Sequence, residues 1–115
     1  MTTPLTTLLL AALTCDPTAA SAKVEQAKAL SAQSMTLARD IALLTTEIAQ
    51  LRQYIAEEKA NPSGVVDLRR LHELGEDIQI DQGQMAVDKA SKARVDAKLA
   101  KVLAEGERLI KGCKR

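Results

Sequence analysis

Apolar residues recur every seven positions in the first half of the chain, in two rows that are offset by three or four. Between residues 37 and 55 every position of both rows is filled by Ile or Leu: Leu37, Ile41, Leu44, Ile48, Leu51 and Ile55. Ile at the first position and Leu at the second are typical of a coiled-coil seam. A stripe this narrow cannot be buried by one helix, so the pattern predicts a helix that packs against another helix.

The first helical arm is predicted to span residues 17–60. Asp16-Pro17 is a helix-start signal, because Asp caps helices and Pro is favoured at the first helical position. No Gly or Pro then interrupts the chain until Asn61-Pro62-Ser63-Gly64, the clearest turn in the sequence. We therefore expect the arm to end at a tight turn over 61–64.

A second arm is predicted over residues 65–111. Ser63 or Gly64 is expected to cap it, with Asp67 in its first turn, where the helix dipole favours an anion. Gly75 and Gly83 are weak points, each costing about 1 kcal/mol relative to Ala in a helix. We expect a bend or a local break between them, over 75–83.

Alanine forms a second regular pattern in this arm, at spacings of four and three residues. Its members are Ala86, Ala90, Ala93, Ala97, Ala100 and Ala104. A row of small side chains lets two helices approach closely, so we interpret it as a packing seam. Val95, Leu99, Val102 and Leu103 supply larger apolar side chains beside it.

These patterns predict an all-α protein, a single helical domain over 1–115 that forms a long, coiled-coil-like antiparallel hairpin. The apolar segment 1–15 is expected to add a short N-terminal helix. Residues 1–22 contain no Lys or Arg, which argues against a cleaved signal peptide. The apolar run 5–13 within these residues is too short to span a bilayer. If any segment contacts a membrane, we expect it to be this run.

Charge is distributed unevenly, although the net formal charge is only +1. Residues 40–81 carry nine acidic and four basic side chains, whereas residues 88–115 carry nine basic and four acidic ones. This asymmetry favours docking of the two arms or of neighbouring subunits, and the alternative is two solvated helix faces. The basic arm contains acidic residues and no aromatic for base stacking, which argues against nucleic-acid binding.

Few residues are suited to chemistry. Cys15 and Cys113 come within about one helical turn of each other in the hairpin and could form a disulfide in an oxidising compartment; the alternative is that their proximity is coincidental. His72 and Glu76 make an i, i+4 pair, but the second His of a zinc-protease motif is absent. We therefore expect no catalytic residues, metal site or cofactor, and no enzymatic activity.

In size and in its Pro62-Ser63 turn, the chain resembles needle and pilus subunits of type III secretion machines, and it also starts with Thr-Thr-Pro. The resemblance covers the hairpin layout, and the Trp and Tyr positions usual in such needles are absent. A small phage virion component fits the composition equally well. We expect a homo-oligomeric structural or assembly subunit of a bundle, ring or filament. The alternative is a helical adaptor, chaperone or inhibitor that binds another protein through one helix face.

Overall fold

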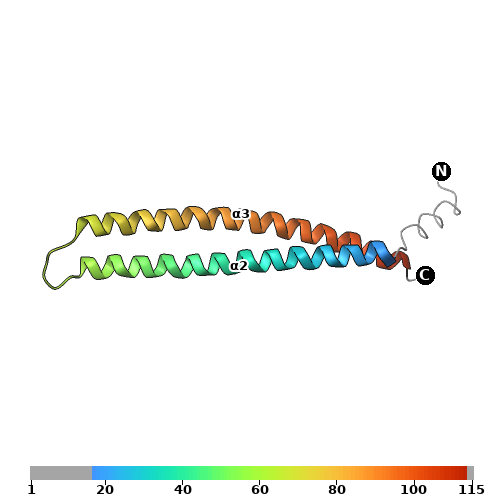
Figure 1. Ribbon diagram of the computed structural model, residues 1–115, viewed down its shortest axis with the longest axis horizontal. Helices are drawn as coiled ribbons and strands as arrows, with labels where there is room; N and C mark the ends of the chain where they lie inside the picture. Colours follow the sequence, from blue (N-terminus) through green and yellow to red (C-terminus); the bar gives the residue numbers. More distant parts are fainter. Residues whose placement is uncertain (1–16, 114–115) are drawn as a thin grey trace. The chain divides into compact units, whose positions relative to one another are not determined.

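The computed structural model of the protein describes residues 17–113, which form two long helices (Figure 1). Helix α2 spans Pro17–Lys59 and helix α3 spans Leu68–Cys113. The helices run antiparallel, and the residues described include no strand. The all-α antiparallel hairpin predicted from the sequence is therefore confirmed, while the predicted N-terminal helix lies outside the described residues.

Helix α2 begins and ends close to the predicted positions. Pro17 is its first residue, where a missing backbone N–H costs nothing. The predicted N-cap, Asp16, lies outside the described part of the chain. Lys59 occupies the last turn, where a cation interacts favourably with the helix dipole. Strong helix formers fill the interval, and the helix stops just before Asn61-Pro62.

Asn61 organises the turn between the helices. Its side-chain Oδ1 accepts hydrogen bonds from the backbone N of Ser63 at 3.1 Å and from the Ser63 hydroxyl at 3.0 Å. The backbone N of Gly64 donates to the Asn61 carbonyl at 3.0 Å. Gly64 has a φ of 74°, a left-handed conformation that glycine adopts without steric cost. The turn predicted at 61–64 is thus present.

The start of the second arm differs from the prediction. Helix α3 begins at Leu68, and its cap is Asp67, because Asp67 Oδ1 accepts a hydrogen bond from the backbone N of Arg70 at 3.1 Å. Neither Ser63 nor Gly64 caps the helix. Glu58 of α2 accepts a hydrogen bond from the Asp67 backbone N at 2.9 Å, and this contact holds the cap beside the end of α2.

Helix α3 continues through Gly75 and Gly83, so a local break over 75–83 is not found. The alternating segment Ile78-Gln79-Ile80-Asp81 is helical as well. The reason is that each glycine costs only about 1 kcal/mol, while the helix-favouring residues around them supply continuous backbone hydrogen bonding.

Each end of the two helices contributes to one of two compact units. We call the first the terminal unit; its described residues are 17–34 of α2 and 93–113 of α3. The second, the turn unit, comprises residues 35–92. Val95 and Val102 are buried in the terminal unit, and Ile48 and Leu74 are buried in the turn unit.

Candidate interaction surface

The Ile and Leu rows of α2 form its inner face in the turn unit. Ile48 is only 5% exposed, and the other five members of the predicted seam are half-buried. The turn unit contains one further helix segment, that of α3, so packing against α3 explains this burial. The seam therefore supports the hairpin itself, and its use between copies of the chain remains a prediction.

The alanine row does not pack inside the hairpin. All six of its members, Ala86, Ala90, Ala93, Ala97, Ala100 and Ala104, are exposed. The row is therefore not a seam within the described hairpin, and its use as a packing seam between copies of the chain stays a prediction. Alanine repeats favour a helix wherever they stand, so their register alone does not identify the face that is buried.

The inner face of α3 is a different heptad pattern, which sequence reasoning recognised only in part. Its positions from 71 to 109 are buried or half-buried: Leu71, Leu74, Ile78, Asp81, Met85, Asp88, Lys92, Val95, Leu99, Val102, Gly106 and Leu109. Three charged residues interrupt the apolar pattern and conceal it. Counting heptads from Leu71, and allowing for polar members, is the signal that would have found this face.

Complementary polar groups join the helices in the terminal unit. Lys23 Nζ lies 2.6 Å from Glu105 Oε2, and the Ser34 hydroxyl donates a hydrogen bond to Asp96 Oδ1 at 2.5 Å. The hydrogen bond from Lys23, followed by its positive charge, lowers the pKa of Glu105. This arrangement keeps the Glu105 carboxylate ionised and fixes the register of the two helices.

Acidic groups meet in the turn unit instead. The charge of Asp81, with smaller contributions from burial, a hydrogen bond with Asp81 and the charge of Asp77, raises the pKa of Glu47. Asp81 Oδ2 is inaccessible to solvent and has no hydrogen-bond partner among the described residues. The proximity of these carboxyl groups disfavours the charged form of Glu47, because like charges repel.

Asp88 adds a further acid to the inner face of α3. It is 8% exposed and accepts a hydrogen bond from Gln84 Nε2 at 2.9 Å. Burial of a carboxylate is costly unless it is hydrogen-bonded, and the neighbouring glutamine supplies such a bond on the same helix.

The residues considered for chemistry do not converge on a site. His72 Nε2 lies 2.9 Å from Glu76 Oε1, and both side chains are exposed. Within residues 17–113, no group of three His, Cys, Asp or Glu side chains is arranged to hold a metal ion. Cys113 is the last residue of α3, but Cys15 lies outside the described residues, so the disulfide stays a prediction.

The apolar N-terminal run 5–13 also lies outside the described residues. No helix described over 17–113 combines the length and the apolar character that crossing a membrane requires.

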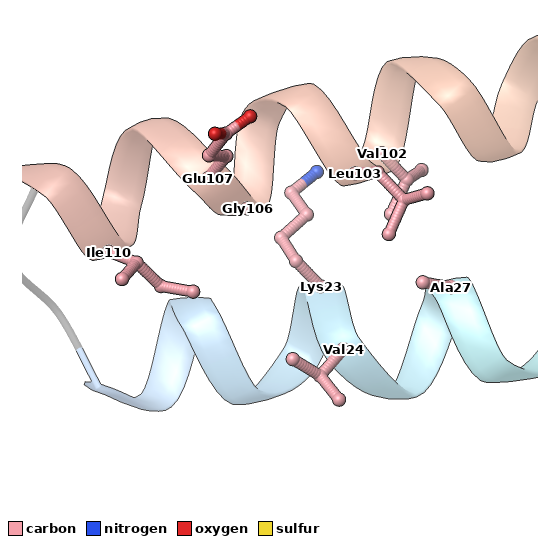
Figure 2. A pocket seen from close by; sticks show the side chains of 8 residues that line it. All are labelled: Lys23, Val24, Ala27, Val102, Leu103, Gly106, Glu107 and Ile110. Atoms are coloured by element: carbon pink, nitrogen blue, oxygen red, sulfur yellow. The ribbon is translucent and has the colours of Figure 1, made fainter.

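A shallow apolar groove between the two helices is the most distinctive surface of the terminal unit (Figure 2). One hollow of about 300 Å³ and an overlapping one of about 350 Å³ share Val24, Ala27 and Leu103. We call the two together the terminal groove. Ile110 extends it in one direction and Leu99 in the other.

Small side chains create this groove. Figure 2 shows Ala27 opposite Val102 and Leu103, and Lys23 reaching from α2 toward α3 near Gly106. A Cβ on Gly106 would lie 3.5 Å from the Cβ of Lys23, so the helices approach closely here. Val102, opposite Ala27, is 6% exposed, whereas Val24, Leu103 and Ile110 along the groove remain 44%, 55% and 44% exposed.

The sequence indicated the large apolar residues of α3 but not the groove. Leu99, Val102 and Leu103 were expected beside an alanine seam, whereas they lie opposite Ala27 and Val24 of α2. Only the register of the two helices shows that small residues of α2 lie opposite large residues of α3. No protein-family model matches the chain, and neither a curated protein nor a solved structure matches it.

Proposed function

We propose that the protein is a non-enzymatic structural or assembly subunit that self-associates through helix faces into a bundle, ring or filament. Secretion needles and phage virions contain subunits of this kind. The proposal rests on how much apolar surface the described hairpin leaves in contact with water.

Exposed apolar residues outnumber buried ones in the described chain. Only four hydrophobic residues are buried, while ten large hydrophobic side chains are exposed. The exposed set is Val24, Met35, Leu43, Tyr54, Val65, Leu68, Ile80, Val87, Leu103 and Ile110. Burial of apolar area contributes about 25 cal/mol per Å², so covering these side chains with another molecule is favourable.

The charge distribution supports association between copies. The acidic stretch 40–81 and the basic stretch 88–115 belong to one chain, so each copy offers both signs to a neighbour. Complementary charge speeds encounter and selects the register of docking, while apolar contact supplies most of the affinity.

A second candidate function is that of a binding module, such as an adaptor, chaperone or inhibitor that accepts a different protein. The observation that favours it is the terminal groove, an apolar surface that belongs to one unit only. A helix that lies in a groove is a common mode of recognition.

Sedimentation equilibrium of the full chain over a wide concentration range tests the proposal, with electron microscopy of the most concentrated sample. A structural subunit should gain mass with concentration and form rings or fibres. A chain that stays monomeric at every concentration contradicts self-association, and a gain in mass only with an added partner protein supports the binding module.

A further inference from the structure

We infer that the terminal groove is a self-association surface, and that its occupant is the same groove of a second copy in antiparallel orientation. This inference rests on the proposed function and specifies the surface, the partner and the orientation. The groove's apolar side chains and the charges at its two ends carry the argument.

The middle of the groove offers apolar side chains from both helices. Val24 of α2 and Leu103 of α3 are exposed on either side of the small Ala27. A two-fold related copy would place its own Val24 and Leu103 over this hollow, so that each copy fills the space that the other's Ala27 leaves. Exposed apolar residues around a small central side chain are suited to this reciprocal packing.

Opposite charges mark the two ends of the groove. Glu107 of α3 lines the end near Ile110 together with Lys23, whose charge is paired with Glu105. Lys28 of α2 lines the end near Leu99. In an antiparallel second copy, Lys28 comes to the end that holds Glu107 of the first copy. At the other end, Glu107 of the second copy comes to Lys28 of the first. A parallel copy would instead place like charges at the same end, which is unfavourable.

Both end charges now belong to exposed pairs within their own helices. Lys28 lies 3.4 Å from Glu25, and Glu107 lies 3.6 Å from Lys111. Exposed pairs of this kind contribute little, so their side chains can reorient toward a second copy at small cost. The antiparallel arrangement therefore gains charge contacts at both ends without breaking the Lys23–Glu105 contact between the helices.

The apolar part of the inference is tested with Leu103→Asp in the full chain, followed by sedimentation. The charge should raise the dissociation constant of self-association by about tenfold or more, since it would lie in the centre of the apolar contact. Gln33→Asp is the matched control, because Gln33 is exposed in the same unit and lines neither hollow of the terminal groove. Circular dichroism verifies that both variants retain their helices.

The orientation is tested with Lys28→Glu, Glu107→Lys and the double variant. Each single reversal should weaken association by roughly threefold to tenfold, as expected when two end contacts become repulsive, and the double variant should restore it. Carbodiimide cross-linking of a mixture of ¹⁴N and ¹⁵N chains should join Lys28 of one copy to Glu107 of another, which mass spectrometry identifies.

Two results separate the inference from the proposed function. If the full chain associates but Leu103→Asp and Gln33→Asp weaken it equally, or if the charge exchange gives no rescue, the groove is not the antiparallel contact and the inference is overturned. If the chain remains monomeric at every concentration, the proposed function and the inference both fail.

Discussion

The terminal unit and the turn unit place opposite chemistry at equivalent points of the antiparallel pairing. As many residues separate Lys23 from Glu47 as separate Asp81 from Glu105. The first pair of facing groups, Lys23 and Glu105, attract each other, whereas Glu47 and Asp81 repel when both are ionised. The pairing of α2 with α3 thus contains an attractive contact in one unit and a repulsive contact in the other. The ionisation of these groups decides how the stability of each unit depends on pH.

The apolar contacts between the helices also differ between the two units. The turn unit presents a continuous Ile and Leu face on α2, and it tolerates Asp81 and Asp88 on the facing side of α3. The terminal unit presents Ala27 and Ser34 on α2, and polar groups bridge the helices. The turn unit thus depends on large apolar side chains of α2, while the terminal unit combines small side chains of α2 with complementary charges.

The largest expected effect comes from Ile48→Asp, in the apolar face of the turn unit. Ile48 is 5% exposed, so the substitution buries an unpaired charge and should destabilise the protein by about 3 kcal/mol or more. Urea unfolding followed by circular dichroism measures the loss. Leu43→Asp on the same helix, at a side chain that is 68% exposed, should stay within about 0.5 kcal/mol. Equal stability of the two variants would contradict the assigned inner face.

A smaller effect is expected when the N-cap of α3, which lies in the turn unit, is removed. Asp67→Ala deletes the acceptor for the Arg70 backbone N and should cost about 1 kcal/mol in urea unfolding. Asp67→Ser should recover most of the stability, because serine also accepts this hydrogen bond. No difference between Ala and Ser would argue that Asp67 does not cap the helix.

The contact between Glu47 and Asp81 and the ion pair between Lys23 and Glu105 should respond to pH in opposite directions. The raised pKa of Glu47 means that its contribution to stability is present below its ordinary value of 4.5 and is lost as pH rises through the higher folded pKa. The lowered pKa of Glu105 means that its contribution is present above 4.5 and is lost as pH falls through the lower folded pKa. Acidification should therefore first strengthen the turn unit and then weaken the terminal unit.

Amide hydrogen exchange, corrected for the intrinsic pH dependence of exchange, measures the two responses separately. Glu47→Gln should remove the gain of the turn unit and raise its stability near neutral pH, because the repulsion by Asp81 disappears. Glu105→Gln should remove the loss of the terminal unit at low pH. Identical pH profiles for the two units in the unmodified chain would contradict the comparison.

The smallest effect is expected at His72, whose contact lies within one helix. His72 and Glu76 are both exposed, and such a pair contributes little to stability. His72→Ala should leave the urea midpoint and the sedimentation behaviour unchanged. A large defect would show that His72 contacts a partner or a metal. It would also show that a residue outside the contacts between the two helices has a functional role.

The sequence by itself determined the two helices, the turn and the inner face of α2. Continuous helix formers between Pro17 and Asn61 leave no other local structure, and the heptad rows from Leu37 to Ile55 have no polar member to obscure them. Asn61 and Gly64 likewise predicted the turn, because both residue types favour the conformations that a tight reversal requires.

Only the tertiary structure decided the inner face of α3, the role of Asp67 and the terminal groove. Asp81, Asp88 and Lys92 occupy inner positions of α3, so hydropathy does not reveal this face. The groove depends on Ala27 meeting Val102 and Leu103, residues far apart in the chain. Register between two helices is a long-range property, which decides the chemistry between them and is absent from the local pattern of either.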